Sequence, residues 1–351
     1  MSGIVALFLI VQFGGLLVAF LVSYTSSAAS IYQTLGNQQA ADFSYIIDFL
    51  LVIIIALLLL NKHKNGEKWE HRFIRSFEGL VLIATSSFAF LFAFTVLLPR
   101  SIEYAYLALA IIAAVGVVTL REKERSTKNA ATIISSIGVG LVLGFYFSFE
   151  YTFIILGIVA IYDYISVFVT KSMIALAKRL SMEDTAFLIG EEDIIAMSED
   201  SLGPEATVKY LRELSESKED EDPLFKKIIE GNRIPEISSI QLGEGDLGLP
   251  LMVAVSAFFT FSNFFIPVLL ITGSGIGILA TLALLKKYNR PLPAIPPLFS
   301  FVAFFSGVAF IITGKEGFLV SILLIVLGVA VMGLGMIFEL ARSAEKTIEE
   351  D

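Results

Sequence analysis

Long apolar runs constrain the fold of this chain more than any other feature of its sequence. Hydrophobic residues make up 56% of the 351 positions, and they gather into ten runs of about 16 to 25 residues. A helix of about 20 residues spans a hydrocarbon layer, where each backbone polar group must be satisfied within its own element. We therefore expect an all-α, polytopic transmembrane helical bundle in a lipid bilayer. The runs are residues 3–23, 45–60, 77–98, 104–120, 130–147, 151–175, 247–265, 268–285, 294–313 and 318–338.

The charged residues between the runs indicate how the bundle is oriented. Lysine and arginine gather in the segments after the second, fourth and eighth runs, whereas the other connecting segments outside the acidic one carry one or none. By the positive-inside rule these basic segments face the cytoplasm, and so do the N-terminus and the tail. The net charge of −9 comes mainly from one acidic segment, so it describes a solvated loop and predicts no nucleic-acid partner. The chain has no cysteine, which excludes thiolate chemistry.

Two acidic residues lie where apolar runs seldom contain any. Asp163 follows the start of the sixth run by about 18 Å of helix, and Asp246 stands at the start of the seventh. A carboxylate in hydrocarbon costs several kcal/mol, so such residues usually mark a functional site. Two facing carboxyls would share a proton, and one could act as a base while the other acts as an acid. The alternatives are a hydrogen-bonded structural acid at Asp163 and a helix-starting acid at Asp246.

Three short motifs accompany these acids. Tyr162 precedes Asp163, Gly243-Glu-Gly-Asp246 opens the seventh run, and Pro293-Ala-Ile-Pro296 opens the ninth. With the continuations over 162–177 and 246–256, these motifs resemble the presenilin and signal peptide peptidase family of intramembrane aspartyl proteases, and archaeal presenilin homologues in particular. The family has nine spans, so the resemblance implies a presenilin-like bundle of nine to ten spans. The basic segments favour the presenilin orientation over that of signal peptide peptidases.

The resemblance implies an intramembrane aspartic endopeptidase that hydrolyses transmembrane helices near the cytoplasmic side. Asp163 and Asp246 would be catalytic, and no cofactor or metal would be needed. The substrates would be single-span membrane proteins or peptides, the location an archaeal cell membrane, and a homo-oligomer is compatible with the resemblance. Two residues depart from the family pattern: Glu244 replaces an apolar residue, and Ile295 replaces a leucine. The residues implied to bind substrate or shape the site are Tyr162, Gly243, Gly245, Pro293, Ala294, Ile295 and Pro296.

The runs and motifs divide the chain into four expected parts. N-terminal transmembrane helices occupy 1–147, the catalytic transmembrane helices 148–180 and 243–339, an acidic cytoplasmic loop 181–242, and a cytoplasmic tail 340–351. We expect an amphipathic helical extension over 173–180 and a helix over 204–214. The segment 234–242, directly before the second acid, could pair as a strand with an unwound substrate.

Other chemistries fit the sequence less well. The string from Gly243 to Gly248 matches the dinucleotide fingerprint, but a membrane span follows it where a βαβ unit is required. His63 and His71 both fall in the second connecting segment, so no span offers a histidine to a serine nucleophile, and no zinc motif of the His-Glu-x-x-His type exists. An ion-coupled secondary transporter with a paired-carboxylate site stays open as an alternative function. A helix-binding scaffold without activity is a third.

Overall fold

The computed structural model describes residues 2–24, 67–120, 125–168, 188–197, 234–288, 293–314, 316–317 and 319–333. The chain divides into two compact units. The first consists of Met1–Ile189 and Leu242–Asp351, and the second of Gly190–Gln241. The expected span at 45–60, the expected helices at 173–180 and 204–214, and the tail at 340–351 lie outside the described residues.

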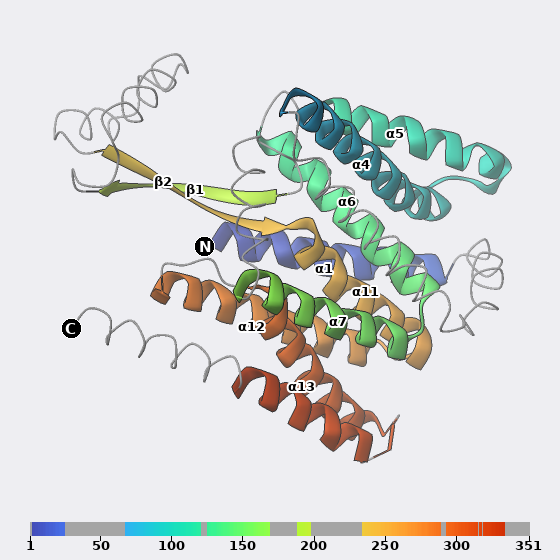
Figure 1. The fold of residues 1–351 in the computed structure, drawn as a ribbon. Coiled ribbons are helices and arrows are strands. Elements are labelled where there is room, and N and C mark those ends of the chain that lie inside the picture. Colours follow the sequence, from blue (N-terminus) through green and yellow to red (C-terminus); the bar gives the residue numbers. More distant parts are fainter. Residues whose placement is uncertain are drawn as a thin grey trace. The chain divides into compact units, whose positions relative to one another are not determined.

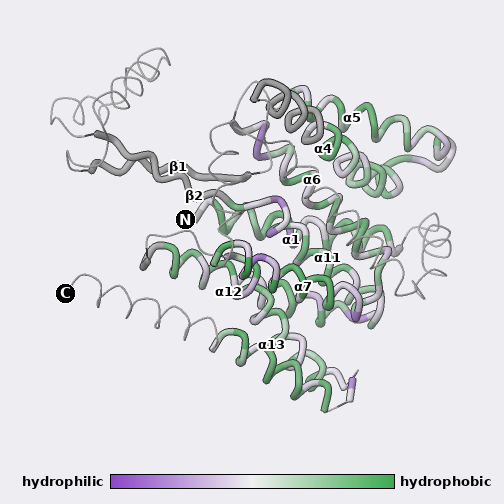
Figure 2. Tube along the Cα trace, in the orientation of Figure 1, coloured by the Kyte–Doolittle hydropathy of each residue, from purple (hydrophilic) through white to green (hydrophobic). Residues whose placement is uncertain are grey.

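The first unit is a bundle of α-helices (Figure 1). Seven of the described helices are long and apolar enough to cross a bilayer, and hydrophobic residues prevail along them (Figure 2). The predicted all-α bundle is confirmed, and the chain is a multi-pass membrane protein. The seven helices are α1 (Ser2–Ser23), α4 (Glu67–Leu97), α6 (Arg125–Tyr146), α7 (Phe149–Phe168), α11 (Glu244–Phe261), α12 (Phe265–Tyr288) and α13 (Ile295–Thr313). A shorter apolar helix, α5 (Tyr106–Leu120), follows a 3₁₀ helix, η1 (Arg100–Ala105).

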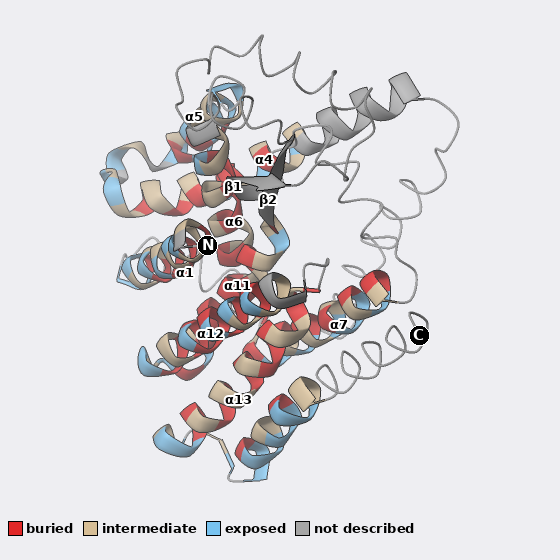
Figure 3. Ribbon diagram, turned by 90° about the vertical axis from the view of Figure 1, so that its left-hand side faces the viewer, coloured by how far each residue is buried: buried red, intermediate tan, exposed pale blue. Residues whose placement is uncertain are grey.

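Helix α11, which begins with the Gly-Glu-Gly-Asp motif, lies at the centre of this unit. It packs against α1, α6, α7 and α12 (Figure 1). Its side chains from Leu251 to Val255 are fully buried, and buried residues follow its length (Figure 3). At the far end, the ring of Phe261 contacts Phe149 of α7 and Phe310 of α13. The surrounding helices therefore determine where the acid at the start of α11 lies.

Glycines allow α6 to approach α11 closely. A Cβ atom added at Gly140 would lie 2.6 Å from the Leu251 side chain, and one added at Gly144 would lie 2.7 Å from Cβ of Val255. Non-bonded carbon atoms do not come so close, so only glycine fits at these positions. These two glycines therefore serve helix packing.

Some helix boundaries differ from those expected. Helix α4 begins at Glu67, ahead of the apolar run expected from residue 77, so His71 belongs to this helix and not to a connecting segment. Good helix formers such as glutamate, lysine and arginine fill its first turns, and they extend the helix beyond its apolar part, Gly79–Leu97. The tenth run forms a helix over Leu319–Gly333. This helix packs against α13, where Gly307 faces the backbone of Ser321.

Two strands, β1 (Leu188–Met197) and β2 (Ile234–Gly243), pair into a two-stranded sheet (Figure 1). A strand was expected at 234–242, and it is present. Its partner in the structure is β1 of the same chain. Because β2 ends at Gly243 and α11 begins at the next residue, the strand leads directly into the Gly-Glu-Gly-Asp motif.

Candidate active site

Hydroxyl groups fix how α7 and α11 lie against each other. Thr152 Oγ1 and Ser256 Oγ share a buried hydrogen bond of 2.7 Å, and the Phe149 N–H donates to Thr260 Oγ1 at 3.3 Å. From the first contact to the second, the residue number rises from 149 to 152 on α7 and falls from 260 to 256 on α11, so the two helices are antiparallel. Continued along both helices, this register brings Asp163, eleven residues after Thr152, level with Asp246, ten residues before Ser256.

Asp163 is held by the start of α13. Its carboxyl is buried, with 8% of the residue exposed, and its Oδ2 accepts the N–H of Ile295 at 3.1 Å. The N–H of Ala294 also interacts with this carboxyl. The first turn of a helix has N–H groups without helical partners, and its positive dipole end attracts a carboxylate. Ile295 is the first residue of α13, so its N–H has no helical acceptor, and the prolines at 296 and 297 offer no N–H beside it.

Asp246 is held by the first turn of its own helix. Gly243 is the N-cap residue of α11, and its N–H donates to Asp246 Oδ2 at 3.3 Å. This is the reciprocal half of a capping box, in which the third residue of the helix bonds back to the cap. Both acids thus lie at a helix N-terminus, Asp246 at that of α11 and Asp163 at that of α13.

The structure brings the two acids together. Their carboxyls lie close enough for their charges to interact. The Pro-Ala-Ile-Pro motif contacts Asp163 through the Ile295 N–H, and Pro293 and Ile295 are buried. Each carboxyl has an oxygen bound to a backbone N–H, Asp163 to that of Ile295 and Asp246 to that of Gly243.

Two of the predicted site residues have open space beside them. Tyr162 is 43% exposed, so its side chain lies on the outer side of α7 and away from the packed interior. A Cβ atom added at Gly245 would meet no described atom within 4 Å. Close packing within the described part of the chain therefore does not require this glycine.

Two polar contacts at the start of α11 were not predicted from the sequence. The fully buried Gln12 of α1 donates through Nε2 to the carbonyl of Leu247 at 2.7 Å. On the α6 side, Ser135 donates to Oε1 of Glu244, and Thr85 of α4 hydrogen-bonds to Ser135 in turn. The sequence signal for the first contact was a glutamine within an apolar run, because an amide that becomes buried there needs a hydrogen-bond partner.

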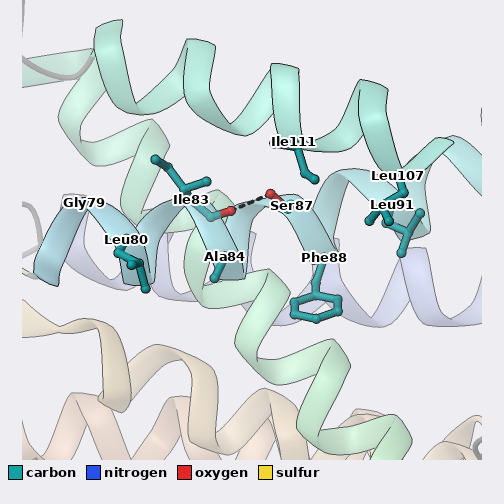
Figure 4. A pocket seen from close by; sticks show the side chains of 9 residues that line it. All are labelled: Gly79, Leu80, Ile83, Ala84, Ser87, Phe88, Leu91, Leu107 and Ile111. Atoms are coloured by element: carbon teal, nitrogen blue, oxygen red, sulfur yellow. Dashed lines mark hydrogen bonds between the residues drawn. The ribbon is translucent and has the colours of Figure 1, made fainter. Parts of the chain in front are cut away.

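A groove on the other side of the bundle lies apart from the acids. It has a volume of about 720 Å³ and lies between α4 and α5 (Figure 4). Ser87 is its only polar side chain, and the Ser87 hydroxyl donates to the carbonyl of Ile83 on the same helix. With apolar walls and no titratable group, this groove suits lipid or apolar contacts and not acid–base chemistry.

A bundle of membrane spans with a buried aspartate in α7 and a half-buried one in the first turn of α11 fits the class of intramembrane aspartyl proteases. The comparison with protein families agrees. The family described as signal-peptide peptidase, presenilin aspartyl protease matches residues 5–327, and the chain belongs to this family. The protein is accordingly an intramembrane aspartic endopeptidase, a hydrolase.

Solved structures share the fold. A presenilin family intramembrane aspartate protease, solved in space group P2, is 20% identical to this chain with a TM-score of 0.51, and the match covers 89% of this chain and 98% of that one. A structure described in the same words, in space group C222, is 21% identical with a TM-score of 0.48, covering 88% of this chain and 95% of that one. No curated protein matched the sequence.

Proposed function

We propose that this protease hydrolyses peptide bonds of transmembrane helices with Asp163 and Asp246 as its two catalytic acids. The observation that carries the proposal is the proximity of the two carboxyls, which the antiparallel register of α7 and α11 places level with each other. Two carboxyls from separate spans lie close enough for their charges to interact, and each is fixed by a backbone N–H. Acids within membrane spans are rare and usually mark a functional site.

The reaction needs a water molecule and one shared proton. The ionised carboxyl removes a proton from the water molecule, and the water oxygen attacks the scissile carbonyl carbon. At the same time the protonated carboxyl donates its proton to the carbonyl oxygen. The product is a neutral gem-diol. On collapse the C–N bond breaks as the nitrogen takes the proton of the protonated carboxyl, while a gem-diol hydroxyl gives its proton to the ionised carboxyl, so the pair is again singly protonated.

The substrates we propose are single-span membrane proteins or peptides. Helical carbonyls are engaged in hydrogen bonds, so a substrate segment must unwind before a carboxyl can polarise its carbonyl. The open space beside Gly245 and the proline-rich start of α13 support binding of an extended backbone. The basic connecting segments support a site near the cytoplasmic side, with the N-terminus in the cytoplasm.

The direct test is cleavage of a single-span substrate by the purified full chain in detergent or liposomes. Asp163→Ala and Asp246→Ala should each abolish cleavage, because one carboxyl alone cannot supply both acid and base. The double variant should be little slower than either single variant, since residues that act as a unit are not additive. Appreciable turnover by either single variant would contradict the assignment.

The same preparation separates the alternative function. An ion-coupled transporter would show uptake into liposomes that depends on the two acids, and it would release no peptide fragments. We expect fragments from the wild-type protein and none from the Asp246→Ala variant. Thermal unfolding of each variant serves as the folding control.

A further inference from the structure

Glu244, the second residue of the Gly-Glu-Gly-Asp motif, is anchored to two other helices. Its Oε1 accepts a hydrogen bond from Ser135, which is fully buried in α6. Ser135 in turn shares a hydrogen bond with Thr85 of α4. A carboxyl at the first position of α11 is thereby tied across α6 to α4.

The geometry of a helix links this anchor to the catalytic acid. Glu244 and Asp246 are two residues apart, so they project from α11 at about 200° to each other. Glu244 points toward Ser135 on α6, and Asp246 leaves the helix on the opposite side, level with Asp163 on α7 by the register of the two helices. Holding Glu244 against α6 therefore fixes the rotation of the first turn that aims Asp246 at its partner.

The number of hydroxyl hydrogens indicates which group donates in each of these hydrogen bonds. The Ser135 hydroxyl has one hydrogen, which it donates to Glu244, so the hydrogen between Thr85 and Ser135 comes from the Thr85 hydroxyl, which shares it with the Val81 carbonyl of its own helix at 2.8 Å. The chain then runs from Thr85 through Ser135 to Glu244. It requires an acceptor at its end, which a glutamate or glutamine side chain provides and an aliphatic side chain does not.

We propose that Glu244 is a positioning residue, which holds Asp246 in line with Asp163 by accepting the Thr85–Ser135 hydrogen-bond chain. This proposal rests on the proposed function, since it assigns Glu244 to the same two-acid site. Glu244 acts through Asp246, so its loss should lower kcat and leave KM nearly unchanged. Misplacement of a reacting group by about 1 Å can slow a reaction about a hundredfold.

The experiment compares four variants of the full chain on one single-span substrate. Glu244→Leu and Ser135→Ala should lower kcat by about tenfold to a hundredfold, with KM within about twofold. Glu244→Gln keeps an oxygen acceptor, so its kcat should stay within about threefold of the wild-type value. The double variant Glu244→Leu with Ser135→Ala should be no slower than the slower single variant, because both break one chain.

Matched controls separate this role from a loss of packing. Thr95→Val in α4 and Ser306→Ala in α13 also remove buried hydroxyls, and among the described residues these hydroxyls bond to carbonyls of their own helices. Both controls should keep the wild-type kcat. If Glu244→Leu fails to fold by thermal unfolding, Ser135→Ala gives the same comparison with the loss of a single oxygen.

Three results would overturn the inference. Unchanged kcat in Glu244→Leu or Ser135→Ala would show that the chain does not position the acid. Equal loss in Glu244→Gln and Glu244→Leu would assign the effect to the charge and not to the acceptor. If the wild-type protein cleaves and Asp246→Ala does not, the proposed function stands after either of these results. A wild-type protein that does not cleave would remove both the proposed function and this inference.

Discussion

Gly138 of α6 provides the sharpest test of the packing described here. A Cβ atom added at this position would lie 1.9 Å from the carbonyl oxygen of Thr85 and 2.7 Å from its carbonyl carbon. Both atoms belong to the backbone of α4, so no side-chain rotation can relieve the contact. For Gly138→Ala, α4 must move away from α6 by about 1 Å or more, given that Cβ contacts below 3.0 Å essentially do not occur.

The expected magnitude follows from two opposing effects. Overpacking of this kind destabilises by about 1–3 kcal/mol, whereas alanine in place of glycine favours a helix by about 1 kcal/mol. The matched control is Gly116→Ala in α5, where an added Cβ would meet no described atom within 4 Å. The two variants carry the same helix-propensity gain, so their stabilities should differ by the overpacking cost of about 1–3 kcal/mol.

The assays are thermal unfolding in one detergent and cleavage of one single-span substrate. Gly138→Ala should unfold at a lower temperature than Gly116→Ala. It should also cleave more slowly, because the displaced Thr85 belongs to the hydrogen-bond chain that ends at Glu244. Equal unfolding temperatures for the two variants would refute the close approach of α4 and α6. Equal stability with unequal cleavage would refute the packing explanation for the activity.

Three further predictions concern topology, pH and the glycine beside the acid. A reporter fused after Lys128 should read cytoplasmic and one inserted at residues 33–39 external, and reversed labelling would move the site to the other side of the membrane. The cleavage rate should be bell-shaped in pH, falling in acid when both carboxyls are protonated and in alkali when both are ionised, and a monotonic rise into alkali would contradict the shared proton. A hydroxyl-bearing peptide isostere should inhibit cleavage, whereas EDTA should not. Gly245→Ala should unfold at the wild-type temperature or above, since the added methyl group has open space, yet cleave more slowly if the substrate backbone passes there; unchanged kcat/KM would remove this glycine from the site.

Much of the membrane architecture could be predicted from the sequence. Length and hydropathy alone identify a span, because the bilayer sets the length of a helix and excludes other backbone structures. Prediction was weaker where a helix leaves the hydrocarbon. The charged first turns of α4 have no hydropathy signal, and their helical structure follows from residue propensity and continuity with the span.

The sequence by itself determined that Asp163 and Asp246 stand out, because a carboxyl in an apolar run is costly enough to be rare. Only the tertiary structure decided what holds them. Most serines and threonines in these helices bond to carbonyls of their own helix, as Ser306 and Thr313 do, and the sequence does not reveal which of them bond across helices. The pairing of Thr152 with Ser256, which sets the two acids level, and the anchoring of Glu244 by Ser135 depend on which helix faces each hydroxyl. That is decided by the packing of α11 against its neighbours, to which residues more than a hundred positions apart contribute.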